Sequence, residues 1–398
     1  MPVCTGHSSS TTASETCHHA PRSRRVLFVQ ATEPANYPPL IHASMLMAER
    51  GWEVTFLSAP ISGNRLELPR HPRIAVRAIH ARPSHVMGKA SYASYIAAAT
   101  GLALRCRPEI VYASDPLGAG PGLLAARLAR ARLVYHEHDS PGPGSLRAWL
   151  ARLRTAAARR AELVVFPNEA RACIAQAELG YPPDRQRIVW NLPRRAELPP
   201  LAPAADGPLM LYYHGGISPE RLPEALVEAM WKLGGRLRLR IIGRETPGAR
   251  GYITWLLDRG VMPDGTKLVK YFGQIPQRHD VLVEAARAQI GLALMPCHGN
   301  DVNLDHMTGA SNKPFDYMAA GLALLVSERA DWRDMFVTPA YARPCDPSDP
   351  ASVAAALSWF LDHPAERRAM AARGRAKIET EWNYDSAFEP VISALVHG

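Results

Sequence analysis

Short apolar strands and helical segments alternate along this chain, in two separate series. The first series predicts strands at 26–30, 53–57, 74–79, 110–114, 132–136 and 163–166, with helices at 39–50, 90–104, 117–130 and 146–160. The second predicts a helix at 219–233 and strands at 209–213, 238–242, 267–272, 290–295 and 322–326. Strands that alternate with helices form a parallel sheet with helices on both faces. The chain is therefore predicted to form two doubly wound α/β domains, with ligands at the carboxyl ends of the strands.

A proline-rich stretch at 193–208 separates the two series, and its prolines cannot continue a helix or a strand. The length of 398 residues also exceeds what one ordinary core accommodates. We expect a disordered leader at 1–24, a first domain at 25–195 and a second at 205–380. A break at Trp382 and Tyr384 precedes a final helix within 381–398.

Composition indicates a globular protein of a reducing cytoplasm. Hydrophobic residues make up 47% of the chain, and the six cysteines are scattered without a Cys-x-x-Cys pair. No run of 18 apolar residues is present, and the leader lacks the apolar middle of a signal peptide. Residues 1–200 hold 25 Lys and Arg against 14 Asp and Glu, which indicates an anionic partner for the first half. No nucleic-acid-binding motif accompanies this charge, so we expect no nucleic-acid partner.

Residues 311–327 predict a short helix followed by a buried strand. Ser311 or Asn312 is placed to cap the helix, and Gly321 to end it. Lys313 is expected to lie exposed at the helix N-terminus, where free N–H groups and the helix dipole attract phosphate. Asp316, one turn away, offers a carboxylate suited to sugar hydroxyls. A cation for phosphate and an anion for ribose on one helix indicate a nucleotide-sugar site, although capping and packing alone are the alternative.

This segment resembles the donor-binding helix of family 4 glycosyltransferases, which have the GT-B fold. The resemblance implies two Rossmann-like domains that face each other across a cleft, with the last helix crossing back to the first domain. Asp316 stands at the second acidic position of the family motif. The first acidic position, which contacts the donor sugar, falls on Thr308 and is lost, unless Asp301 or Asp305 replaces it.

The same resemblance implies the reaction. Family members transfer a sugar from a nucleotide diphosphate sugar to a hydroxyl acceptor, here with retention and in polysaccharide or glycoconjugate biosynthesis. We expect no cofactor and no metal, since no Asp-x-Asp motif occurs. A nucleotide-sugar epimerase of the same architecture and a catalytically inactive GT-B-like partner protein are the alternatives.

Two loops of the second domain are expected to bind the donor. Gly215 and Gly216 follow a strand, so backbone N–H groups there can approach a ligand, and a helix is expected to begin at Pro219. Arg221 matches a family cation that binds the diphosphate, whereas Gly216 replaces the other cation. Gln274 and Ile275 match the backbone that holds the nucleobase.

The segment Tyr135–Asp139 follows the end of a strand in the first domain. His136 and His138 share one face, but no third metal ligand is spaced nearby. The resemblance implies that His138 contacts the donor sugar and that Asp139 is its partner on the acceptor side. A structural His–Asp pair is the alternative. The catalytic group is accordingly predicted as His138, Arg221 and Lys313.

An arginine-rich helix at 145–160 belongs to the basic first half. Leu146, Trp149, Leu150 and Leu153 form one apolar stripe, flanked by arginines that include Arg152 and Arg154. Such a stripe packs on its own domain or lies on an anionic bilayer surface. The second case predicts peripheral contact with the inner face of the cell membrane.

Overall fold

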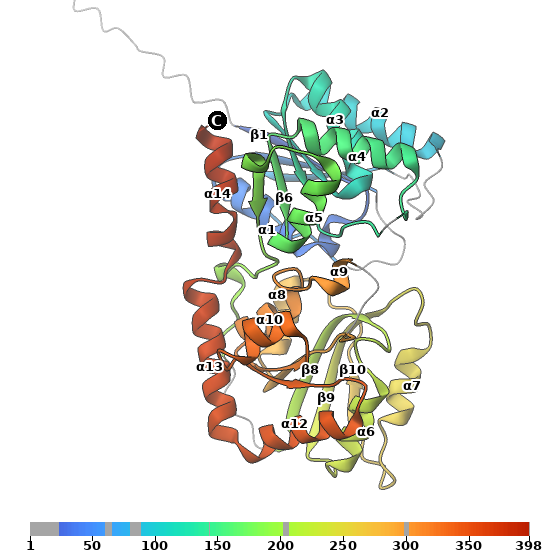
Figure 1. The fold of residues 1–398 in the computed structure, drawn as a ribbon, viewed down its shortest axis with the longest axis vertical. Helices are drawn as coiled ribbons and strands as arrows, with labels where there is room; N and C mark the ends of the chain where they lie inside the picture. Colours follow the sequence, from blue (N-terminus) through green and yellow to red (C-terminus); the bar gives the residue numbers. More distant parts are fainter. Residues whose placement is uncertain are drawn as a thin grey trace, which may run out of the picture.

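The computed structural model describes residues 24–59, 66–79, 89–142, 144–201, 207–297 and 302–397. Within these residues the chain forms two parallel sheets, one above the other in Figure 1. The first sheet has the order β3 (Ile74–Ala78), β2 (Glu53–Ser58), β1 (Arg25–Gln30), β4 (Ile110–Ser114), β5 (Arg132–His136), β6 (Leu163–Phe166) and β7 (Gln186–Ile188). The second has the order β10 (Val269–Tyr271), β9 (Leu237–Glu245), β8 (Leu209–Ile217), β11 (Ile290–Ala293), β12 (Ala323–Ser327) and β13 (Ala342–Cys345). In each sheet the strand order reverses direction beside the first strand of the domain, β1 or β8, which is the topology of a doubly wound sheet. The doubly wound prediction is therefore confirmed.

Helices cover both faces of the first sheet. Its helices are α1 (Pro38–Glu49), α2 (Lys89–Cys106), α3 (Asp115–Ala129), α4 (Ala148–Arg160) and α5 (Glu169–Leu179). Alternate residues of β1 divide between two cores, as the pleat requires. Phe28 belongs to the core under α1, whereas Leu27 belongs to the core under α2, α3 and α4. Parallel strands covered in this way are apolar throughout, which explains the runs in the sequence.

The helices of the second domain position its strand ends. They are α6 (Glu224–Lys232), α7 (Tyr252–Arg259), α8 (Arg278–Ala285), α9 (Val302–Asp305), α10 (Asn312–Ala319), α11 (Ala330–Trp332) and α12 (Pro350–Asp362). The helix expected from 219 begins only at Glu224, so that expectation was wrong. Arg221 and Leu222 donate their N–H groups to the Ser218 carbonyl in a turn, and Pro223 is extended. The strand before it is also longer than expected and includes Gly215 and Gly216.

The chain returns to the first domain at its end. Helix α13 (Pro364–Thr380) runs along the second domain, and α14 (Tyr384–His397) continues beside the first (Figure 1). The Tyr384 hydroxyl donates to the Pro39 carbonyl at 3.0 Å. Arg132 donates to the carbonyls of Ala394 and Leu395. The predicted crossover helix is therefore confirmed.

The apolar stripe of helix α4 packs against the core of the first domain. Leu150 is buried, and Trp149 and Leu153 pack against the same core. Arg154 is also buried and forms an ion pair with Glu137 at 2.7 Å, so it is no surface cation. Among the described residues, no helix combines the length and apolar content that crossing a bilayer requires. The predicted leader lies outside the described residues except for Arg24.

Candidate functional site

The end of strand β8 and the start of helix α10 meet at Gly215 and Lys313. A methyl group on Gly215 would lie 3.2 Å from Lys313 Cε and 3.6 Å from its Nζ. Gly215 also has a φ of 116°, which side chains rarely adopt. The Lys313 side chain therefore packs closely against a strand end whose backbone conformation favours glycine.

Arg221 lies against the next residue of the same strand. A methyl group on Gly216 would lie 2.7 Å from Arg221 Nη1, and that nitrogen lies 3.5 Å from the Gly216 carbonyl oxygen. The predicted phosphate-binding residues Gly215, Gly216, Arg221 and Lys313 are thus brought together by the fold. Gly243, on the neighbouring strand, was not predicted to matter. A methyl group there would lie 1.9 Å from the Gly215 carbonyl oxygen, so this approach of β8 and β9 requires glycine.

Lys313 is not exposed at the helix start, contrary to the expectation. Only 8% of the residue is accessible, because its stem packs under the strand end at Gly215. Burial, together with the charge of Arg221, lowers the pKa of Lys313 to about 7. An anion placed against these two cations would restore the charged form. Ser311 is the N-cap residue, but its side chain makes no capping hydrogen bond.

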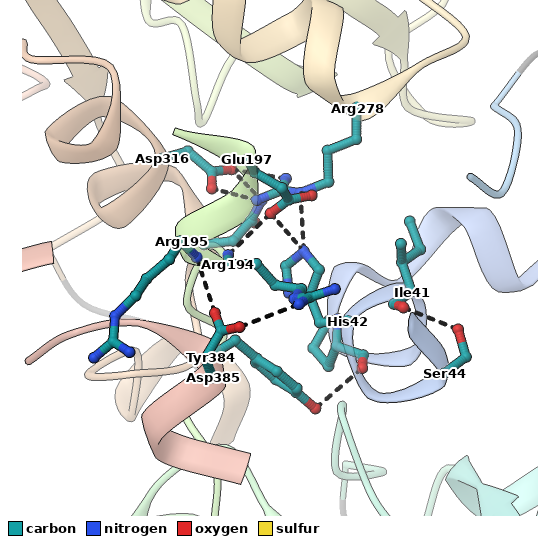
Figure 2. Close-up of polar contacts among 12 residues, drawn as sticks. Ile41, His42, Ser44, Arg194, Arg195, Glu197, Arg278, Asp316, Tyr384 and Asp385 are labelled. Carbon is teal, nitrogen blue, oxygen red and sulfur yellow. Dashed lines mark hydrogen bonds and ion pairs between the residues drawn. The ribbon is translucent and has the colours of Figure 1, made fainter. Parts of the chain in front are cut away.

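Asp316 takes part in a chain of buried polar contacts that links the two domains (Figure 2). Arg278 donates two hydrogen bonds to the Asp316 carboxylate, at 2.5 and 3.1 Å, and one to Glu197 at 3.0 Å. Glu197 also contacts Nε2 of His42, on α1, at 2.8 Å. Burial opposes ionisation of Asp316, but Arg278 and His214 outweigh it and lower the pKa of its carboxyl.

The Asp316 carboxylate is consequently closed to a ligand in this structure, although an open carboxylate was expected. Asp316 is 0% exposed. Its Oδ2 atom accepts hydrogen bonds from Arg278, Asn312 and His214. A carboxylate inside a protein needs such partners, because its desolvation is otherwise too costly. A contact of Asp316 with ribose stays a prediction. Arg278, which lies 38 positions before Asp316, was missed, because no motif pairs the two.

Thr308, at the position of the missing carboxylate, has a carboxylate beside it. The Thr308 hydroxyl donates to Oδ2 of Asp331, at 3.0 Å, and Arg329 contacts the other oxygen at 3.2 Å. Asp331 is the second residue of α11, which follows strand β12, so it is held at the carboxyl edge of the sheet. Of the two predicted substitutes, Asp301 lies outside the described residues, and Asp305 is exposed. Sequence spacing did not reveal Asp331, because it comes from a different strand end.

His138 lies at the carboxyl edge of the first sheet, and its ring is enclosed. The residue is 4% exposed, and burial lowers the pKa of its imidazole to about 3, so the ring is neutral at physiological pH. Its centroid is 3.9 Å from that of His136 and 5.4 Å from that of Tyr37. Neither of its ring nitrogens has a hydrogen-bond partner among the described residues. Unpartnered buried nitrogens suit a ligand hydroxyl.

Asp115 supports this turn and was not predicted. Its carboxylate accepts the backbone N–H of His138 at 2.8 Å. It is half-buried at the end of β4, with a left-handed φ of 58°. Loss of solvent and the charge of Asp139 raise the pKa of Asp115 to about 8. Asp139, predicted on the acceptor side, has a side chain that is 74% exposed and lies 3.9 Å from Arg171.

The predicted nucleobase segment follows strand β10. Gln274 and Ile275 are half-buried there, and Ile275 packs against the core beneath. The N–H of Glu67, from the first domain, donates to the carbonyl of the next residue, Pro276. Within the described residues, no three His, Cys, Asp or Glu side chains gather as a metal site requires.

Family profiles match both halves of the chain. Residues 42–191 match a profile described as "Glycosyl transferase 4-like domain", and residues 220–393 match one described as "Glycosyl transferase-like". Among curated protein sequences there is no significant match.

Solved structures of similar fold span almost the whole chain. HepE from Anabaena, in complex with UDP and glucose, has a TM-score of 0.69 at 14% identity, covering 94% of this chain and 99% of HepE. Sucrose-phosphate synthase from Thermosynechococcus elongatus has a TM-score of 0.68 at 14% identity, over 94% and 98% of the two chains. A glycosyltransferase from Rickettsia africae has a TM-score of 0.70 at 10% identity, over 95% and 100%. At such identities the structures establish the shared fold.

Proposed function

Because the chain belongs to the family 4-like glycosyltransferases with the GT-B fold, we propose that it transfers a sugar from a nucleotide diphosphate sugar to a hydroxyl acceptor. The main support is the pair of cations, Lys313 and Arg221, at the strand end formed by Gly215 and Gly216. Two positive side chains beside a glycine backbone suit a diphosphate. HepE has been solved with UDP and with UDP-glucose, so a UDP-sugar is the first donor to test.

The proposed reaction proceeds with retention at the anomeric carbon. The bond from that carbon to the diphosphate oxygen breaks, and the acceptor oxygen forms the new bond on the same face. The acceptor proton passes to the leaving phosphate, so no protein base is assigned. Lys313 and Arg221 stabilise the negative charge that develops on the leaving diphosphate, and stabilisation of such charge is usually the largest single contribution to catalysis. His138 faces the sugar with a neutral imidazole.

We also propose that this site needs no divalent ion, because Lys313 and Arg221 supply the positive charge. The acceptor is proposed to belong to polysaccharide or glycoconjugate synthesis, as the family resemblance implies. The positive excess of residues 1–200 suits an anionic acceptor or an anionic membrane. The apolar stripe of α4 packs against the core of its own domain and cannot contact a membrane. We therefore propose that exposed arginines of this helix, such as Arg152 and Arg160, make the contact with an anionic membrane.

A panel of nucleotide sugars tests the proposal. Release of nucleoside diphosphate that requires an acceptor, with the anomeric configuration kept in the product by NMR, supports a retaining transferase. Conversion of the sugar nucleotide to its epimer without an acceptor supports the epimerase alternative. No turnover with any donor supports the inactive partner. Turnover that persists in EDTA supports the metal-free site, whereas a loss that Mg²⁺ reverses contradicts it.

A further inference from the structure

Another contact between the domains lies at the N-terminus of helix α5. Two side chains of the first domain, Asn168 and Arg171, reach the backbone of residues 303–308 in the second. Asn168 Nδ2 donates to the carbonyls of His306 and Thr308, at 3.0 and 2.8 Å. Arg171 donates to the carbonyls of His306 and Asn303, at 3.0 and 2.7 Å. We call this pair the α5 clamp.

The orientation of the clamp is determined by its own helix. Asn168 is the N-cap of α5, and its Oδ1 accepts the backbone N–H of Arg171 at 2.8 Å. With the oxygen committed to the helix, the amide nitrogen faces the second domain. Asn168 is 2% exposed and Arg171 is 3% exposed. Buried donors of this kind need acceptors, and carbonyls of the other domain supply them.

The clamp joins the two halves of the candidate site. Arg171 Nη1 donates to the carbonyl of His138 at 3.0 Å, so one guanidinium holds the His138 turn and the segment at 303–306 together. That segment continues through Thr308 into helix α10, which bears Lys313. Arg171 therefore connects the turn that bears His138, in the first domain, to the segment that leads to Lys313, in the second.

We propose that Asn168 and Arg171 are positioning residues, which hold His138 and the donor helix in register for transfer. The inference rests on the proposed function, and it adds two residues that touch neither substrate. In a site divided between two domains, the reacting groups meet only if the domains are held at the correct separation. Misplacement by about 1 Å costs roughly 100-fold in rate.

Asn168→Asp is the sharpest test. An aspartate keeps the oxygen that caps α5, but it replaces two donors with an acceptor that faces two carbonyls. Arg171→Lys is the second variant, because one ammonium group cannot span the three carbonyls that the guanidinium fork reaches. The matched control is Arg185→Lys. Arg185 also donates to backbone carbonyls, those of Arg159 and Ala161, but both belong to its own domain.

For an active enzyme, we expect both clamp variants to lower the kcat of transfer by roughly 10- to 100-fold. The Kd for UDP should stay at the wild-type value, because the clamp touches no phosphate ligand. Hydrolysis of the donor by water should increase relative to transfer. Wild-type kcat in Asn168→Asp, or an equal loss in Arg185→Lys, overturns the proposal.

A second measurement separates this inference from the proposed function. If the wild type turns over no donor, the transferase proposal fails, and small-angle X-ray scattering still decides the clamp. A larger radius of gyration in Asn168→Asp than in the wild type and Arg185→Lys supports it, and equal values overturn it. If Asn168→Asp does not fold, Arg171→Lys gives the same comparison.

Discussion

Arg278 and Asp316 form a two-pronged ion pair between helices α8 and α10, with nitrogen–oxygen distances of 2.5 and 3.1 Å. The guanidinium also contacts Glu197, in the segment that leaves the first domain (Figure 2). The donor helix is thereby attached to the neighbouring domain through charges withdrawn from solvent. This arrangement makes the stability of the donor helix depend on a residue that no phosphate-binding motif includes.

Arg278→Met should destabilise the protein strongly, because it leaves the Asp316 carboxylate buried without its main partner. Removing one partner of a buried pair costs about 3–5 kcal/mol. The free energy of unfolding in urea measures the loss. The double variant Arg278→Met/Asp316→Asn should recover part of it, since an amide needs no counter-charge. A single variant as stable as the wild type would show that water solvates Asp316.

The same contacts predict loss of stability in acid. Burial alone would raise the pKa of Glu197, but Arg278 and His42 outweigh it and lower the pKa to about 2, below the ordinary 4.5. A carboxyl with a depressed folded pKa contributes stability above its unfolded pKa and loses it as the pH falls through the folded one. The urea concentration at the unfolding midpoint should therefore decrease as the pH is lowered from about 5 to about 2. In the Glu197→Gln variant the urea midpoint should change less with pH than in the wild type. The same change in both proteins would show that Glu197 does not cause the loss of stability in acid.

Lys313→Ala and Arg221→Ala should each weaken the binding of UDP. Each removes a charge-assisted contact with the diphosphate, worth about 1.5–3 kcal/mol. Isothermal titration calorimetry gives the affinities. Lys232→Ala is the matched control, because Lys232 is an exposed lysine at the end of α6 in the same domain. Unchanged affinity in either site variant would remove that residue from the diphosphate site.

Affinity for a UDP-sugar should decrease as the pH rises from about 6 to about 9. Burial and Arg221 lower the pKa of Lys313 to about 7, so the free protein loses this cation over that range. A bound diphosphate favours the charged lysine, and binding above pH 7 should take up a proton. Calorimetry in buffers of different ionisation enthalpy counts that proton. Lys313→Arg should remove both effects, because arginine stays charged.

His138→Ala should reduce sugar transfer far more than the binding of UDP. The imidazole belongs to the first domain, and the proposed contact is with the sugar rather than with the nucleotide. Steady-state kinetics and calorimetry on the same preparation separate the two effects. Turnover equal to wild type would assign His138 to the core, together with His136.

The sequence predicted most of the described strands, because the central parallel strands are largely apolar, but it missed β7 and β13, which are partly exposed strands at the sheet edges. It also grouped Gly215, Arg221 and Lys313, since strand ends and helix starts meet at one edge of a doubly wound sheet. The sequence did not reveal Arg278 or Asp331. Each follows a different strand of the sheet from its partner, Asp316 or Thr308, so sequence spacing does not pair them. The sequence also misjudged the exposure of Lys313, because the depth of a side chain depends on the strand packed above it, and Gly215 allows that packing.

Helix α14 has a consequence for how the protein is made. Phe388 and Ile392 belong to the same core as Phe28 and Trp52 of the first domain. The N–H of Tyr384 also donates to the carbonyl of Pro193, at 2.9 Å, where the chain leaves that domain. During synthesis the core of the first domain therefore lacks one wall until α14 has been made, although most of that domain is translated much earlier. The apolar face of the first domain that α14 covers therefore needs protection until this helix has been made and has packed against it.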